Sequence, residues 1–451
     1  MKKFLILVMM VTVFAASFFG GCAVNGRDGR DGKDAQDVSI QEIYEAAKAI
    51  EGNENLTFDQ FLKEYLSYND DTVGLKSVIN RSLMSGVSIL SRFAYSDGSG
   101  YLSGMRRSYK VYTGSGAILW LDKSAGDAYV VTNCHVVYDD SSVSAFCQDI
   151  RLYLYGQDEK GTNFSIDLNN DIVNDENYRI EAEIIGASVS YDIALLKVTG
   201  SDVLKRSDAV AARFSQSSEV YAGEYVYAIG NAESEGMSAS NGIVSRESEY
   251  IELNMSDIDE NAYTEYRVMR ITAPINHGNS GGALYNTRGE IIGIVNAKLE
   301  GEDIDNMGYA LPANYVKRLL KLMYDSYASD SNNSGVRKAF LNIATSVSDS
   351  YSRYNESMGV AEIYDTVRVE SISGAPARAN LQNGDIFKSV KITDSQGTVK
   401  EDIKVTRRYH VQDVMFSVRL GDTVTITVER GGQNVDVAIV FDSENYFRNY
   451  Y

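Results

Sequence analysis

The chain has 451 residues, of which 44% are hydrophobic and 23% charged, and its formal net charge at pH 7 is −19. This length predicts several domains, and the apolar fraction predicts folded cores. The charge argues against nucleic acid as a partner, because phosphate binding needs clustered Lys and Arg side chains and the sequence has no basic stripe.

The first 21 residues predict an export signal. Two lysines precede an apolar run from Phe4 to Phe19, and two glycines and Cys22 follow it. A charged start, an apolar stretch and a cleavage site of small residues define a secretory signal peptide. The end of the run, FGGC, resembles a bacterial lipobox, in which the cysteine is lipid-modified and becomes the first residue. An uncleaved transmembrane anchor is the alternative, since the run nearly reaches the ~20 residues that span a bilayer.

Both alternatives place the rest of the chain outside the cytoplasm, and we expect an exported protein that a lipid on Cys22 anchors to a bacterial membrane. Residues 22–37 predict a tether, because they are charged and have glycines at every third position. That is the collagen period, but three triplets without proline are too few for a triple helix. Residues 38–70 predict a short helical segment, since apolar residues recur in it at helical spacing.

From residue 74 to 328 the pattern changes to short apolar runs separated by Gly, Asn, Asp and Ser, which predicts many short strands in a barrel or sandwich. One helix is expected near residues 312–327, with Pro312 in its first turn. The polar stretch 329–335 predicts a linker. The strand pattern then resumes over 336–445 and predicts a second, smaller β-rich domain.

The stretch INHGNSGGAL, residues 275–284, contains the candidate nucleophile Ser280. Serine becomes a nucleophile when a histidine takes its proton and a third group orients that histidine. The glycines allow a tight turn in which the backbone N–H groups of Gly278 and Ser280, with Asn279 between them, point at a developing oxyanion. His277 is the nearest histidine in sequence, but a separation of three residues in a turn does not give hydrogen-bond geometry with Ser280.

A better candidate for the base is His135, one of three histidines, which follows an apolar strand in VVTNCHVV. Asp192 begins the apolar run of YDIALLKV, where a carboxylate is conspicuous. Taken singly, each residue has a purely structural interpretation, as a satisfied histidine or as the start of a strand. Together with Ser280 they follow the order His, Asp, Ser of the chymotrypsin-like catalytic triad.

These motifs carry a resemblance to a known family. TNCHVV, YDIALLKV and INHGNSGGAL resemble the three catalytic motifs of the HtrA family of trypsin-like serine proteases, and four further stretches fit in the same order: GSGAIL, GNAESEGMSASNGIVS, IIGIVNA and MGYALP. The resemblance covers roughly residues 75–320. It implies a mostly β protein with a chymotrypsin-like double β-barrel and an active site between the barrels. It also implies that His135 is the general base, Asp192 orients it, and Ser280 is the nucleophile, without cofactor or metal.

The chain departs from the family pattern at two positions. Proline is usual where His277 stands, and Thr272 replaces a common acidic residue. With His277 in place of the usual proline, the chain lacks a constraint on φ at this position. The loop switches between active and inactive conformations in this family. The family accepts small aliphatic P1 residues, in a pocket that residues 275–279 and 295–299 would line here.

Residues 336–445 resemble the PDZ domain that follows the protease in this family, on the strength of VRVESISGAPARANLQNGDIF and LGDTVTITVERGGQNVDVAIV. The resemblance implies that the domain captures peptide C-termini, which add as a strand to a sheet edge while loop N–H groups cap the carboxylate. On this resemblance the loop is Met358, Gly359 and Val360, of which only the glycine is distinctive. A purely structural or oligomer-contact domain is the alternative.

Cys134 and Cys147 are the only cysteines after Cys22. They lie thirteen positions apart, in a compartment where disulfides persist, and a bridge would contribute about 3 kcal/mol in the chain-entropy model. Two buried free thiols are the alternative, and the sequence does not decide between them. Cys134 is a poor nucleophile for His135 to activate, because neighbours in extended structure point to opposite sides.

The combined expectation is a membrane-tethered HtrA-type serine endopeptidase. It would cleave unfolded or damaged exported proteins through an acyl-enzyme and bind peptide C-termini with its PDZ domain, and the family implies a homotrimer. A catalytically silent PDZ-containing binding or chaperone lipoprotein is the main alternative, although all three triad residues are present. A structural surface lipoprotein would explain the tether but none of the motifs.

Overall fold

The computed structural model describes residues 48, 70–96, 107–157, 165–166, 172–173, 177–216, 219–254, 263–298, 307–329, 336–377 and 380–450. The predicted signal peptide and tether, and most of the predicted helical segment and linker, lie outside these residues. The chain divides into two compact units, Met1–Gly74 and Leu75–Tyr451. In the part of the chain that the structure describes, no helix is long and apolar enough to cross a membrane.

The first strand is preceded by a helix, α4 (Asp70–Leu83), where the sequence predicted strands from residue 74 onward. Leu75, Val78 and Leu83 recur at helical spacing and pack on an apolar core to which both barrels contribute. Gly74 is typical of a turn, yet it lies within the helix. Tertiary packing of the apolar stripe outweighs the cost of about 1 kcal/mol that a glycine imposes on a helix.

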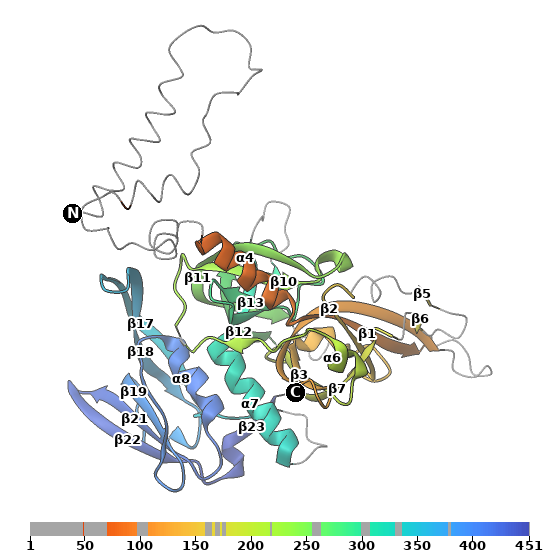
Figure 1. Ribbon diagram of the computed structural model, residues 1–451. Helices are drawn as coiled ribbons and strands as arrows, with labels where there is room; N and C mark the ends of the chain where they lie inside the picture. The colour runs from red at the N-terminus through yellow and green to blue at the C-terminus, as the bar shows by residue number, and fades with distance from the viewer. Residues whose placement is uncertain are drawn as a thin grey trace. The chain divides into compact units, whose positions relative to one another are not determined.

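The first barrel is a closed ring of six antiparallel strands (Figure 1). In ring order they are β1 (Gly86–Ser96), β2 (Arg107–Asp122), β3 (Asp127–Thr132), β8 (Ile193–Val198), β7 (Ile180–Ser188) and β4 (Asp149–Leu154). Ala194, Leu196 and Val198 of β8 all face its core, at the period of two that a strand imposes. The short helix α6 (Asp202–Arg206) and the paired strands β5 (Ser165–Ile166) and β6 (Ile172–Val173) are not part of the ring.

The second barrel closes in the same way, because β13 pairs with both β10 and β14. Its strands in ring order are β10 (Tyr225–Gly230), β11 (Ser238–Asn254), β12 (Tyr263–Ile271), β15 (Gly308–Pro312), β14 (Glu290–Lys298) and β13 (Ala283–Asn286). The two-residue strand β9 (Arg213–Phe214) adds to β14 in parallel. The prediction of a mostly β, chymotrypsin-like double barrel is confirmed.

The predicted helix after the second barrel is also confirmed, as α7 (Ala313–Ser329), which begins directly after Pro312. Val316, Leu319 and Met323 are fully buried and share one helix face. The helix approaches the first barrel closely, since a Cβ on Gly186 of β7 would lie 2.4 Å from the Met323 Cβ. It therefore packs against strands of both barrels and into their common core.

The C-terminal domain is built on a separate sheet with its own apolar core. The sheet order is β17 (Ile343–Asn355), β18 (Val360–Ile372), β19 (Ile386–Thr393), β21 (Thr423–Arg430) and β22 (Gln433–Val440), with β20 (Val399–Lys404) paired to β19. The helix α8 (Arg408–Val414) and a two-stranded sheet of β16 (Val336–Ala339) and β23 (Phe447–Tyr450) complete it. These sheets are consistent with a PDZ domain. β17 is paired only to β18 among the described strands, so it is an edge strand.

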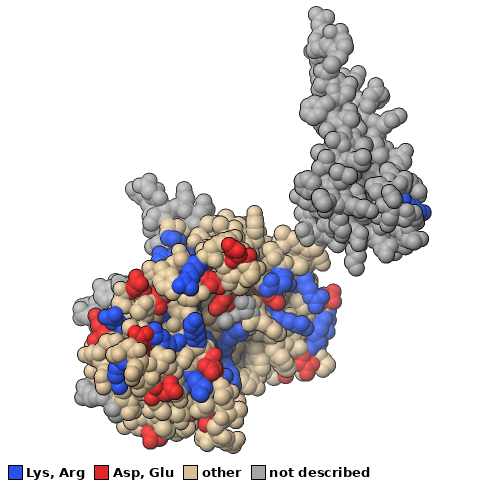
Figure 2. Space-filling view, turned by 90° about the vertical axis from the view of Figure 1, so that its left-hand side faces the viewer, with Lys and Arg blue, Asp and Glu red and all other residues tan. Residues whose placement is uncertain are grey.

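Ion pairs join the C-terminal domain to the two barrels. Arg267 of β12 donates to Asp413 of α8 at 2.5 Å, and only 5% and 7% of the two side chains are exposed. Arg318 of α7 meets Glu401 of β20 at 2.8 Å. On the outer face shown in Figure 2, by contrast, acidic and basic side chains are interspersed, a pattern typical of charge that keeps a protein soluble.

Replacing Arg267 by methionine is expected to lower the free energy of unfolding by about 3–5 kcal/mol, because the Asp413 carboxylate is left buried without its partner. Denaturant titration followed by circular dichroism measures this change. Lys321→Met is the matched control, since Lys321 forms an exposed pair with Asp325 at 2.9 Å, and such pairs contribute about 0.3–0.5 kcal/mol. Equal losses in the two variants would contradict a buried pair at Arg267.

Candidate active site

A single 3₁₀ turn after strand β3 positions His135. The strand ends at Thr132, and the turn Cys134–Val136 follows one residue later. Cys134 and Val136 are buried in the barrel core, whereas half of the His135 side chain is exposed. The two buried neighbours therefore anchor the turn and leave the imidazole at the surface of the barrel.

Asp192 lies in the turn between β7 and β8 and is almost fully buried. Its carboxylate accepts hydrogen bonds from the His135 backbone N–H at 2.9 Å, from His135 Nδ1 at 2.7 Å and from Asn296 Nδ2 at 2.6 Å. Its φ of +49° lies in the left-handed region, which costs an L-residue about 1–2 kcal/mol. Asn133 Nδ2 donates to the Asp192 carbonyl at 2.8 Å and helps to hold this conformation.

The contact with Asp192 determines where His135 carries its proton. With Nδ1–H donating to the carboxylate, Nε2 is left as the acceptor nitrogen, which is the tautomer of a general base. Burial opposes the charged imidazolium, but the attraction of the Asp192 carboxylate and its hydrogen bond together raise the pKa of His135 above the ordinary value of 6.5.

Ser280 lies in the GNSGG turn between β12 and β13. Gly278 has a φ of +88°, and a Cβ there would lie 2.1 Å from the Asn231 carbonyl oxygen, so only glycine fits. The Ser280 hydroxyl donates to the Asn296 carbonyl at 3.0 Å. Because a hydroxyl has one proton, Ser280 does not donate to His135 in this state, and its hydroxyl must turn before it can.

Two backbone N–H groups of the same turn are available to a negatively charged oxygen. The N–H groups of Gly278 and Ser280 donate to no acceptor among the described residues, whereas that of Asn279 bonds within the turn. The His277 carbonyl accepts from the Glu233 N–H at 2.7 Å. Since the C=O and N–H of a trans peptide point in opposite directions, the Gly278 N–H points away from Glu233. Such N–H pairs form oxyanion holes.

Comparison with known proteins shows what the chain is similar to. The protein-family model described as "Trypsin-like peptidase domain" matches residues 114–294, which include the site described above. "Serine protease Do-like HtrA" of Lactobacillus helveticus is 26% identical over 384 residues, which are 83% of this chain and 80% of the relative. The protein of the same name from Lactococcus lactis subsp. cremoris is 25% identical over 408 residues, or 87% of this chain and 88% of the relative. The chain is therefore similar to HtrA-type serine proteases over most of its length.

Other HtrA-type proteins match as well. A "Probable periplasmic serine endoprotease DegP-like" of Rhizobium meliloti is 27% identical over 314 residues, 69% of this chain and 50% of that relative. Among solved structures, the HtrA-type protease AlgW with a decapeptide covers 81% of this chain and 97% of its own, at 19% identity and a TM-score of 0.47. In the present chain, His135 and Asp192 come from the first barrel and Ser280 from the second, so the site lies where the barrels meet.

The disulfide that the sequence left open is absent. Cys134 and Cys147 are both free, although both are buried in the core of the first barrel. The Cys147 thiol donates instead to the backbone carbonyls of Arg92 at 3.4 Å and Asp149 at 3.3 Å. A shared core does not by itself align two thiols, because a bridge needs a specific direction and separation of both Cβ atoms.

The prediction that Met358, Gly359 and Val360 form the carboxylate-binding loop of the C-terminal domain is wrong. Met358 and Gly359 form the turn of the β17–β18 hairpin, and Val360 is the first residue of β18. The N–H groups of Met358 and Gly359 donate to the Asn355 carbonyl at 3.3 and 2.8 Å, so neither is available to a ligand. The glycine at 359, with a φ of +69°, marks the hairpin turn itself.

Sequence reasoning missed three buried polar residues that hold the candidate site. Asn133, in TNCHVV, supports the Asp192 backbone, and Asn296, in IIGIVNA, contacts both the Asp192 carboxylate and the Ser280 hydroxyl. Ser115, in GSGAIL, bonds the GNSGG turn. Their position inside the matched motifs was the only available signal, because a sequence does not reveal which polar residues are buried.

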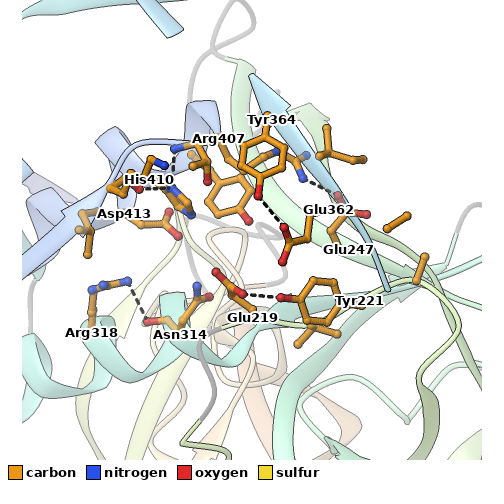
Figure 3. A pocket seen from close by; sticks show the side chains of 18 residues that line it. Glu219, Tyr221, Glu247, Asn314, Arg318, Glu362, Tyr364, Arg407, His410 and Asp413 are labelled. Carbon is orange, nitrogen blue, oxygen red and sulfur yellow. Dashed lines mark hydrogen bonds and ion pairs between the residues drawn. The ribbon is translucent and has the colours of Figure 1, made fainter. Parts of the chain in front are cut away.

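A separate cavity of about 350 Å³ lies between the second barrel and the C-terminal domain (Figure 3). Its lining includes none of the residues of the site. Charged groups in it bond one another: Arg407 donates to Glu247, and Tyr364 donates to Glu362. No group of His, Cys, Asp or Glu side chains in the described ranges is arranged to hold a metal ion. The cavity therefore lies at a polar boundary between the second barrel and the C-terminal domain.

NMR titration of the histidine rings tests the His135–Asp192 pair. His135 is expected to titrate above pH 6.5 and His410 below it, because burial lowers the pKa of His410. Asp192→Asn removes the attracting carboxylate and should lower the pKa of His135, while His410 serves as an unchanged internal control. A His135 pKa that stays constant in Asp192→Asn would refute the pairing.

Proposed function

We propose that this protein is an active HtrA-type serine endopeptidase in which Ser280 attacks the scissile carbonyl, His135 takes its proton and Asp192 orients His135. The observation that carries the proposal is the 2.7 Å contact between His135 Nδ1 and the Asp192 carboxylate. The unpaired N–H groups of Gly278 and Ser280 support it independently, because they supply an oxyanion hole.

The proposed reaction begins with the Ser280 hydroxyl turning from the Asn296 carbonyl to Nε2 of His135. His135 takes the hydroxyl proton as Oγ bonds to the scissile carbonyl carbon, and the Gly278 and Ser280 N–H groups receive the oxyanion. The imidazolium then gives its proton to the leaving amine, which leaves an acyl-enzyme on Ser280. Water, deprotonated by the same imidazole, hydrolyses that ester.

Location outside the cytoplasm belongs to the same proposal. The signal peptide at 1–21, lipidation at Cys22 and the tether at 22–37 support it, as does the periplasmic relative. The substrates are then unfolded or damaged exported proteins, because only an extended chain can enter a cleft between barrels. The protease domain (74–328) would act as a homotrimer, and a PDZ domain (336–445) would bind peptide C-termini.

A groove along the C-terminal domain suits a peptide end better than the Met358 turn does. A cavity of about 670 Å³ lies between α8 and the start of the edge strand β17, where residues 340–345 line it, and barrel residues such as Tyr191 and Arg267 line its other side. Asn342, with a φ of +58°, makes the chain turn immediately before β17. An extended peptide can add to the unpaired side of β17 as a further strand, which is the binding mode of PDZ domains.

Lys338 gives this groove a positive charge. Its ammonium lies 3.9 Å from the centroid of the Phe416 ring and 3.4 Å from the Tyr191 hydroxyl. Burial lowers the pKa of Lys338 to about 8, although the nearby Asp413 opposes this shift. Lys338 is therefore mostly charged at neutral pH, when it attracts a peptide carboxylate, and loses this charge as the pH rises above 8.

Casein degradation by the full-length protein tests the protease proposal. Wild type is expected to cleave casein, and Ser280→Ala is expected to lose at least about 10³-fold of this rate, because the triad acts as a unit. Ser85→Ala is the matched control, because it also removes a buried serine hydroxyl but lies outside the GNSGG turn and the proposed reaction. Equal cleavage by wild type and Ser280→Ala, or cleavage by neither across a range of peptide activators, would favour the catalytically silent binding protein.

Fluorescence anisotropy with a labelled peptide that has a free C-terminus tests the groove. Affinity for wild type is expected to fall by up to about tenfold between pH 7 and pH 9 as Lys338 loses its proton. Lys338→Met should bind weakly at both pH values, whereas Lys388→Met, which removes an exposed partner of Glu429, should bind like wild type. A C-terminal amide that binds as tightly as the free acid would rule out carboxylate recognition.

A further inference from the structure

Ser115 is a fully buried serine of β2 that bonds the GNSGG turn across the barrel boundary. Its hydroxyl donates to the Gly278 carbonyl at 2.6 Å and accepts from the Asn231 N–H at 2.8 Å. Its own N–H donates to the Ser280 carbonyl at 2.9 Å, and its carbonyl accepts from the Thr132 hydroxyl at 2.7 Å. One residue of the first barrel thus contacts two carbonyls of the second barrel's reactive turn.

These contacts constrain the Ser280 N–H. The carbonyls of Gly278 and Ser280 belong to the peptides before and after the one that carries the Ser280 N–H. With both carbonyls held by Ser115, the peptide between them has little freedom to rotate, because each peptide unit is planar. Ser115 therefore sets the direction of one proposed oxyanion donor.

The Ser115 hydroxyl also acts indirectly on the other oxyanion donor, the Gly278 N–H, through the turn that begins at Asn231. In that turn the Glu233 N–H bonds the His277 carbonyl and so orients the Gly278 N–H. Glu233 and Ser234 have φ values of +53° and +62°, a left-handed backbone that persists only where its surroundings hold it. Ser115 holds the start of this strained turn by accepting from the Asn231 N–H.

The space around Ser115 is closed, so the arrangement cannot relax easily. A Cβ on Gly281 would lie 2.2 Å from the Ser115 carbonyl oxygen, and a Cβ on Gly230 would lie 3.1 Å from the Ser115 hydroxyl oxygen. The turn approaches Ser115 this closely only because glycines face it. Removal of the Ser115 hydroxyl leaves the Gly278 carbonyl and the Asn231 N–H buried without this hydrogen-bond partner.

We infer that Ser115 is a positioning residue that aims both oxyanion N–H groups at the reacting carbonyl, acting from the opposite barrel. This inference rests on the proposed protease function. Its consequence is a specific kinetic signature: loss of Ser115 weakens transition-state stabilisation while substrate binding along the cleft is retained.

The experiment compares Ser115→Ala with wild type in the full-length protein, with a chromogenic peptide that has valine at P1. The expected result is a fall in kcat of about 10- to 100-fold with KM changed by less than threefold, because a misaimed oxyanion donor acts only in the transition state. The affinity of a valine peptide boronic acid, which forms a tetrahedral adduct with serine, should fall by the same factor as kcat/KM.

Ser85→Ala is the matched control. Ser85 is a buried serine whose hydroxyl also makes two bonds, to the Ser82 carbonyl at 2.7 Å and the Tyr285 hydroxyl at 2.8 Å, and neither partner lies in the GNSGG turn. Both variants should lower the unfolding temperature by similar amounts, while only Ser115→Ala loses kcat. Equal kcat in the two variants, or a Ser115→Ala defect confined to KM, would overturn the inference.

Labelling of the active-site serine with a fluorophosphonate distinguishes failure of the Ser115 inference from failure of the proposed protease function. If wild type hydrolyses the peptide and is labelled while Ser280→Ala is not, the protease proposal stands and the comparison of Ser115→Ala with Ser85→Ala decides the inference alone. If wild type is neither active nor labelled, the proposed function and the inference fall together.

Discussion

The Asp192 carboxylate is the single group on which the arrangement of the site depends. It accepts two hydrogen bonds from His135 in the first barrel and one from Asn296 in the second. A buried carboxylate that loses its donors is strongly destabilising, so the acid and its donors hold one another in place. The same contact therefore orients an imidazole and fastens two separately closed barrels to each other.

A second constraint is the absence of free space around the GNSGG turn. A Cβ on Gly281 would meet both the Ser115 carbonyl and the Thr132 hydroxyl at 2.2 Å, so the turn lies directly against the backbone of the opposite barrel. Carbonyl and N–H directions in the turn are consequently set by contacts across the boundary.

Much of the architecture could be predicted from the sequence, because strands with period-two burial and three motifs in a fixed order are local signals. The conformation of Ser280 could not, since its rotamer depends on a carbonyl sixteen residues away in another strand. Gly359 was misinterpreted for a different reason: one glycine serves a hairpin turn and a ligand loop equally well. Helix α4 was missed because Gly74 favours a turn and the apolar stripe that follows it is short. In the folded protein the packing of that stripe stabilises the helix despite the glycine.

The buried free thiols of the first barrel have a consequence for how this protein responds to oxidants. Burial raises the pKa of Cys134, and it raises that of Cys147 to about 11, so neither is a thiolate at neutral pH. Oxidants and disulfide exchange act on exposed thiolates. Oxidation of these two cysteines therefore requires opening of the barrel, and the folded barrel is not altered by the redox potential of its surroundings.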